Sequence, residues 1–208
     1  MSERNQELYD AIIRGDRKTV QAEVEKAIAD KRPVVDLMNG SMIPAMREIG
    51  ARFARNEAYV PGMLIAARAM QTGLNLIEPL LAEAGHEPRA RVCLGTVKGD
   101  LHDIGKNLVG MMLKGAGFAV DDLGVDCDVA KFEAGVGRGA HAVLCSALLT
   151  TTMPYMKTVV EHFKGQGVKV IIGGAPVTQK YAEEIGADGY GADANAAVSA
   201  VETVLGLV

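Results

Sequence analysis

Hydrophobic residues recur along the chain with two different periods, and the change between them lies near Pro88. Up to that point they recur every three or four positions, which is the spacing of amphipathic helices. Gly15 and Pro33 interrupt the pattern, and Asp16 is placed to cap a helix. Four helices joined by short loops favour an antiparallel bundle. Their apolar faces carry Leu8, Ile12 and Ile13, then Val20, Val24, Ala27 and Ile28, then Val35, Met38, Met42, Ile43, Met46, Ile49 and Phe53, and finally Met63, Leu64, Ala67, Met70, Leu74, Ile77 and Leu81.

Beyond Pro88, short apolar runs alternate with helical stretches. Five repeats of strand and helix predict a parallel sheet with right-handed crossovers and helices on both faces. The expected fold class is α/β: a four-helix bundle followed by a flavodoxin-like, Rossmann-type, doubly wound sheet of five parallel strands in the order 2-1-3-4-5. The aperiodic segment 84–90 is the predicted linker, which gives domains of residues 1–86 and 87–208. The predicted strands are 91–97, 118–124, 142–148, 168–173 and 187–191, and the predicted helices lie near 104–116, 128–138, 153–165, 177–185 and 193–205.

Composition and charge narrow the function classes. A formal net charge of -4 and a pI near 5.6 argue against nucleic-acid binders and membrane-surface proteins, whose binding faces are basic. No apolar run reaches the roughly 18 residues of a membrane span, and the start MSERNQELYD is charged, so we expect a cytoplasmic protein. The three cysteines lie far apart without a CxxC motif, which indicates reduced thiols. The ten methionines suit either irregular core gaps or an adaptable ligand-facing surface.

Polar and glycine residues follow three of the predicted strands. Ligands of doubly wound sheets bind beyond the carboxyl ends of the strands, near the switch between the first and third. Asp100 and His102 follow the first strand, four hydroxyl residues lie within 146–152 after the third, and Gly173-Gly174 ends the fourth. Each has an ordinary alternative, because hydroxyls also cap helices, glycines also serve turns, and a loop histidine can lie free on the surface.

Several common site motifs are absent from the sequence. It contains neither GxxxxGK[ST] nor GxGxxG, so a phosphate cradle is unsupported, and it contains no HExxH of a zinc hydrolase. A phospho-receiver domain shares the predicted topology, but the third strand ends in Ser146 rather than in aspartate. The strand ends therefore call for a different chemistry.

Three motifs at these strand ends together resemble the signature of cobalamin-binding domains that hold the cofactor base-off, with a histidine on cobalt. They read Asp100-Leu101-His102-Asp103-Ile104-Gly105, Ser146-Ala147-Leu148 and Gly173-Gly174. The resemblance implies that His102 is the axial metal ligand, that Asp100 accepts the proton of its Nδ1, and that Thr152 bonds Asp100. The displaced nucleotide tail would lie at the ends of the third, fourth and fifth strands. The implied cofactor-binding residues here are Gly99, Asp100, His102, Asp103, Ile104, Gly105, Ser146, Leu148, Thr150, Gly173, Gly174, Gly191 and Asp193.

The helical half extends the resemblance over nearly the whole chain. Residues 47–70 are similar to the helical cap that precedes this domain in methionine synthases and in corrinoid proteins of methyltransferase systems. In that family, the residues that match Phe53, Val60, Met63 and Leu64 cover the upper corrin face and shield the methyl group. Because 208 residues leave no room for substrate- or folate-binding modules, the chain resembles a free-standing corrinoid methyl carrier.

The resemblance implies one component of a multi-component methyltransferase. Cob(I)alamin would take a methyl group from a substrate:corrinoid methyltransferase, and methylcob(III)alamin would give it to a second methyltransferase with tetrahydrofolate or coenzyme M as acceptor. A corrinoid reductive activase would be a further partner. The methyl donor stays open among methanol, methylamines, betaines and aryl methyl ethers.

Two other functions use a similar cobalamin-binding half. One is a cobalamin-dependent sensor or regulator, which would carry an additional basic DNA-binding domain. The other is the cobalamin-binding subunit of a mutase, which would need a catalytic barrel in another chain.

Overall fold

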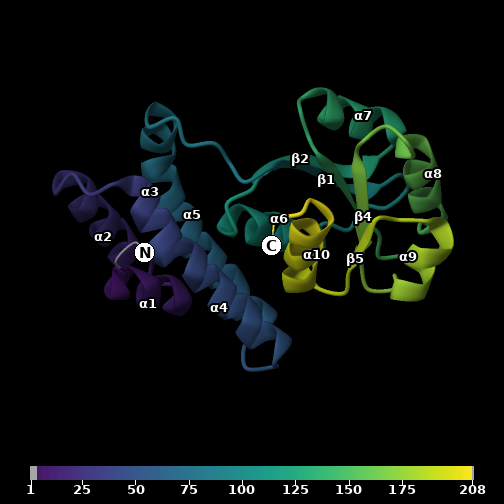
Figure 1. Cartoon of the computed structure of the whole chain (residues 1–208). Coiled ribbons are helices and arrows are strands. Elements are labelled where there is room, and N and C mark those ends of the chain that lie inside the picture. Colours follow the sequence, from purple (N-terminus) through teal and green to yellow (C-terminus); the bar gives the residue numbers. More distant parts are fainter. Residues whose placement is uncertain (1–3, 208) are drawn as a thin grey trace. The chain divides into compact units, whose positions relative to one another are not determined.

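A computed structural model of the chain describes residues 4–207, and these form two compact units (Figure 1). The helical unit comprises the described residues up to Pro88 together with Gly115–Gly117, and the α/β unit comprises Arg89–Lys114 and the described residues from Phe118 onward. Within the described range, no helix combines the length and the apolar character that crossing a membrane requires.

Local signals in the sequence set the ends of the first helices. The side chains of Asn5 and Asp16 accept hydrogen bonds from the backbone N–H groups of Leu8 and Thr19, and Gly15 ends the first helix with a left-handed φ of 75°. Asp16 therefore caps the second helix as predicted. The helical unit contains α1 (Gln6–Arg14), α2 (Arg17–Ala29), α3 (Val34–Leu37), α4 (Ile43–Ala54) and α5 (Val60–Glu83).

One π-helical turn, η1 (Met38–Met42), divides the third predicted helix into α3 and α4. Pro44 in the first turn of α4 explains the division. Proline has no backbone N–H, and its ring clashes with the carbonyl four residues earlier, which here belongs to Gly40. A wider turn removes both conflicts at once.

Aliphatic and thioether side chains fill the core of the helical unit. The described methionines of this unit are buried, so they fill gaps in the core rather than form a ligand-facing surface. The largest buried side chains are those of Leu8, Ile12, Met42, Met46, Met63, Met70 and Ile77.

The α/β unit is built on a parallel sheet of five strands in the order β2-β1-β3-β4-β5, which confirms the predicted topology. The strands are β1 (Arg91–Val97), β2 (Ala119–Cys127), β3 (Ala142–Ser146), β4 (Lys169–Gly173) and β5 (Gly189–Gly191). The helices that follow them are α6 (Ile104–Gly115), α7 (Val129–Gly137), α8 (Pro154–Phe163), α9 (Gln179–Ile185) and α10 (Ala194–Val204).

Helices cover both faces of this sheet (Figure 1). On one face, strand residues such as Cys93 and Ile172 share a core with α7, α8 and α9. On the other face, Leu94 lies beside α6 and Ile171 beside α10, so closely that Gly110 of α6 and Gly189 of β5 have little room for a side chain. Burial on both faces explains why β1, β3 and β4 read as nearly continuous apolar runs rather than as alternating ones.

Candidate functional site

A short loop between β1 and α6 carries Asp100 and His102. The Nδ1 atom of His102 lies 2.9 Å from Oδ1 of Asp100, and the backbone N–H of His102 donates to the same oxygen at 3.0 Å. The side chain of Asp100 is fully buried, whereas that of His102 is 51% exposed. Because the ionised carboxylate can only accept a hydrogen bond, it favours the neutral tautomer of His102 that carries its proton on Nδ1, and in that tautomer Nε2 keeps a free electron pair.

The second carboxylate oxygen of Asp100 is held by the loop that follows β3. Oδ2 accepts hydrogen bonds from the N–H groups of Leu148 at 2.9 Å and Leu149 at 3.3 Å, and from the hydroxyl of Thr152 at 2.8 Å. Burial raises the pKa of Asp100, but the hydrogen bonds from Leu148, His102 and Thr152 outweigh it and hold this pKa well below its usual range. Asp100 is therefore a buried carboxylate that orients the imidazole.

Thr152 also contacts the backbone of its own turn, since its Oγ1 lies 2.9 Å from the carbonyl oxygen of Leu149. Its methyl group lies on the side of Gly99, where even an added Cβ would stand 3.7 Å away. The methyl group of Thr152 therefore fits without crowding the loop. The hydroxyl of Thr96, a buried residue of β1, donates a hydrogen bond to the backbone carbonyl of His102 at 2.8 Å.

The glycines at the other strand ends lie against neighbouring backbone. Gly173 pairs with Ser146 on one side and Gly191 on the other. A Cβ at Gly173 would stand 2.7 Å from the carbonyl oxygen of Gly191, and one at Gly174, whose φ is 133°, would stand 1.9 Å from that of Ala147. Gly191 is itself tight against α10 at Ala197. Close approach of the chain to itself thus requires these glycines, whichever ligand lies beyond them.

Two other predicted residues of this region differ in their surroundings. Thr150 is exposed on the loop after β3. Asp193 is the N-cap of α10, and its carboxylate accepts the N–H of Ala196 at 2.8 Å. Asp193 therefore has a structural role in the α/β unit in addition to any role toward a ligand.

An exposed apolar surface surrounds His102. Leu101 and Ile104 are each 72% exposed, and Leu148 and Leu149 are each 42% exposed, although large aliphatic side chains are usually buried. Gly105, in the first turn of α6, has no heavy atom within 4 Å of the place where a Cβ would stand. An imidazole beside several exposed aliphatic side chains fits a broad apolar macrocycle that brings its own metal. Of these residues, the sequence motif did not single out Leu101 and Leu149, because only their exposure distinguishes them.

The residues predicted to shield a cofactor from above lie at one end of the α4–α5 hairpin. Phe53 is near the end of α4, and Val60, Met63 and Leu64 are in the first turns of α5. Phe53 and Leu64 are partly buried and Val60 is exposed, but Met63 is fully buried. As it stands, Met63 packs as a core residue.

Comparisons with known proteins agree over most of the chain. A family model described as a B12 binding domain matches residues 90–199, and a second of the same description matches residues 4–78. The chain is 38% identical to a corrinoid protein of Desulfitobacterium hafniense and 40% identical to the dimethylamine corrinoid protein of Methanosarcina barkeri, and each match covers 96% of both proteins.

The chain is also similar to two solved structures whose names refer to cobalamin. A cobalamin-binding protein from Desulfitobacterium hafniense has a TM-score of 0.78 at 29% identity, with 95% of this chain and 96% of that one covered. The methanol:cobalamin methyltransferase complex from Methanosarcina barkeri has a TM-score of 0.85 at 25% identity, with 97% and 79% covered.

Proposed function

Because the chain belongs to the B12-binding domain family and is a corrinoid protein of that family, we propose that it binds cobalamin through His102 and carries methyl groups between two methyltransferases. One observation supports this above all: buried Asp100 lies 2.9 Å from Nδ1 of His102, a half-exposed ring that has exposed apolar side chains near it in the sequence. When bound, the corrinoid supplies a cobalt that takes up and releases the methyl group. The residues of the chain would orient the axial histidine, bind the periphery of the cofactor and shield the methyl group.

Asp100 and Thr152 control the proton and the orientation of His102 in this proposal. The carboxylate holds the Nδ1 proton, so Nε2 keeps its electron pair for the cobalt. The Thr152 hydroxyl and the Leu148 N–H keep Asp100 ionised through their contacts with Oδ2. A charged partner increases the basicity of a coordinating imidazole, which strengthens its bond to a metal.

The remaining predicted residues would bind the periphery of the cofactor. Gly99, Asp103, Ile104 and Gly105 would face the lower side of the ring, next to His102. The displaced nucleotide tail would follow the polar ends of β3 and β4, at Ser146, Leu148, Thr150, Gly173 and Gly174, toward Gly191 and Asp193. The backbone contacts of the glycines are compatible with this path, because a flat sheet end without side chains leaves its outer side free.

Phe53, Val60 and Leu64 would shield the methyl group from water in the same proposal. They share one end of the α4–α5 hairpin and retain exposed surface. Met63 is fully buried, so its contribution would be to support Leu64 and Val60 from beneath rather than to touch the cofactor.

The names of the relatives suggest the partners. Curated relatives with 38–40% identity over almost the full chain include several dimethylamine corrinoid proteins, so we take a dimethylamine-specific methyltransferase as the first candidate partner and a methanol-specific one as the second. The acceptor of the second methyltransferase would be tetrahydrofolate or coenzyme M, and a reductive activase would restore the carrier after oxidation.

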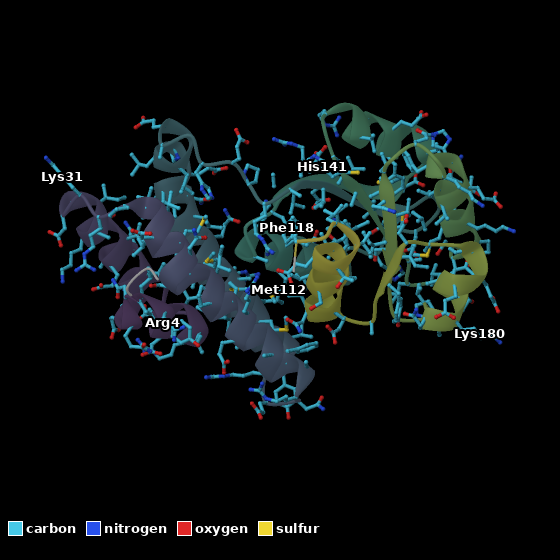
Figure 2. The ribbon with its side chains drawn as sticks, viewed as in Figure 1. Arg4, Lys31, Met112, Phe118, His141 and Lys180 are labelled. Carbon is cyan, nitrogen blue, oxygen red and sulfur yellow. The ribbon has the colours of Figure 1, made fainter. Side chains whose placement is uncertain are left out.

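Reconstitution with cobalamin tests the role of His102. We expect the wild-type protein to bind cobalamin with the absorption spectrum of a histidine-ligated, base-off form, and His102→Ala to lose that spectrum. His141→Ala is the matched control, because His141 (Figure 2) immediately precedes β3, at the opposite, amino-terminal edge of the same sheet, and its Nδ1 accepts the N–H of Arg91. An unchanged spectrum in His102→Ala would refute the axial role. Methyl transfer from dimethylamine, with methanol as comparison, then identifies the donor.

A further inference from the structure

The carboxyl end of β2 departs twice from regular pairing with β1. Leu94 pairs with Asp122, but Gly95 pairs with Gly124 and Val97 with Cys127, so β2 gains one residue at each of two bulges. Each bulge contains a residue with left-handed backbone: Gly124 with a φ of 79° and Asp126 with a φ of 51°. Bulges of this kind bend a strand end and redirect its polar groups.

Asp126 adopts a conformation that L-residues with a side chain rarely take. Glycine would adopt it without strain, as Gly124 does at the first bulge. The surrounding structure maintains the conformation, since Nζ of Lys131 lies 3.1 Å from the carbonyl oxygens of both Val125 and Asp126. At Asp126 the side chain makes a contact that glycine could not make.

Asp126 makes two hydrogen bonds to the loop after β1, one through its side chain and one through its backbone N–H. The carboxylate of Asp126 accepts the N–H of Gly99 at 2.8 Å, and the N–H of Asp126 donates to the carbonyl of Asp100 at 3.0 Å. Gly99 itself has a left-handed φ of 83°, so this loop turns sharply just before Asp100. Asp126 therefore holds both peptide groups that flank this turn.

We propose that Asp126 is a positioning residue, which fixes the backbone of Asp100 and thereby the orientation of the His102 ring. The side chain of Asp100 is held by the loop after β3. Its carboxylate can orient the His102 ring only if the main chain of Asp100 is also fixed. The effect on cobalt coordination rests on the proposed function. The effect on the imidazole itself does not, because it acts in the protein without cofactor.

Three variants separate the carboxylate from the backbone conformation. Asp126→Gly keeps the left-handed turn and the N–H to Asp100, but removes the acceptor for Gly99. Asp126→Asn keeps an acceptor oxygen and tolerates the same φ. Lys31→Gly is the matched control, because Lys31 also has a left-handed φ, 55°, and lies in the loop after α2 of the helical unit (Figure 2).

The first readout is nitrogen NMR of the histidine-labelled, cofactor-free protein at a pH where the imidazole is neutral. We expect His102 of the wild type to be mainly the Nδ1–H tautomer, and Asp126→Gly to lower the ratio of the two tautomers about fivefold, as the loss of one hydrogen bond predicts. Asp126→Asn and Lys31→Gly should match the wild type. Thermal unfolding should show Asp126→Gly to be close to the wild type in stability, since relief of the left-handed turn offsets the lost hydrogen bond.

The second readout is the absorption spectrum of added cobalamin, in which Asp126→Gly should lower the equilibrium between histidine-on and histidine-off forms about fivefold. A wild-type tautomer ratio in Asp126→Gly would overturn the positioning role, and so would an equal loss in Asp126→Asn. If the tautomer ratios change as expected while no protein binds cobalamin, the proposed function fails and the positioning role of Asp126 stands.

Discussion

Gly105 offers a test in which stability and binding should change in opposite directions. It is the second residue of α6, its φ is not left-handed, and a Cβ would meet no heavy atom within 4 Å. Nothing in the fold therefore requires glycine there. A helical glycine is destabilising by about 0.5–1 kcal/mol relative to alanine, and the lower figure applies in a first turn, where fewer backbone hydrogen bonds depend on the residue.

We therefore expect Gly105→Ala to raise the free energy of unfolding of the cofactor-free protein by about 0.5 kcal/mol. In a chain of this length that corresponds to a rise in Tm of about 1–2 °C. In the proposed function Gly105 faces the lower side of the corrin ring, next to the exposed Ile104, so the same methyl group would stand where the ring is proposed to lie. Forcing one extra methyl into a close-packed contact costs about 1–3 kcal/mol, so cobalamin affinity should fall about 5- to 150-fold.

Two measurements and one control decide the outcome. Thermal unfolding is followed without cofactor, and cobalamin binding is followed by absorption titration. Gly137→Ala on α7 is the control, because a Cβ at Gly137 also meets nothing within 4 Å and α7 does not border His102. It should gain similar stability and keep the wild-type affinity. If Gly105→Ala binds cobalamin as tightly as the wild type, the corrin does not lie against the first turn of α6.

Three further predictions concern other groups of the α/β unit. Asp100→Asn should lose about 1.5–3 kcal/mol of stability and 10- to 100-fold in cobalamin affinity, because every partner of this carboxylate is a donor and an amide nitrogen would face one of them; denaturant unfolding and titration measure both, and an unaltered affinity contradicts the orienting role. Asp122→Ala should destabilise by roughly 2–3 kcal/mol, because it leaves the buried ammonium of Lys106 without its carboxylate partner. Lys106→Met should destabilise by less, because the Asp122 carboxylate that remains is partly exposed to water. Equal losses in urea unfolding would refute this. Burial raises the pKa of Cys93 to about 12 and that of Cys145 well above its usual value, so a thiol reagent at neutral pH should modify them only after unfolding, and rapid labelling of the native protein would contradict their burial.

The order of the elements could be predicted from the sequence because β1, β3 and β4 are largely apolar runs and helical patterns separate successive strands. The predicted strand ends were wrong where tertiary contacts determine the point at which a strand ends. The third strand was expected to reach residue 148 but ends at Ser146, because the N–H of Leu148 turns away to Asp100. The second was expected to end at 124 but continues to Cys127 through two bulges, which interrupt the regular pattern of the strand.

The candidate site could be predicted from the sequence where its residues lie at a fixed spacing along the chain. The three-residue separation of His102 and Gly105 is such a signal, and so is a hydroxyl near the end of β3. The contribution of Asp126 has no comparable signal, because it depends on a left-handed backbone and on two main-chain hydrogen bonds. The glycines of β4 show the opposite difficulty, since Gly173 and Gly174 match a binding motif while their immediate neighbours are backbone atoms of the same sheet.

The strand order explains why one loop can be fixed this firmly. β1 lies between β2 and β3, so the loop that follows it is the one with a strand end on each side at the switch point. β2 supplies Asp126, which holds the main chain, and the loop after β3 supplies Thr152 and two N–H groups, which hold the carboxylate. A histidine after an edge strand would have only one such neighbour. The geometry of His102 is therefore a consequence of topology as much as of motif, and a substitution in either flanking strand end should act on it.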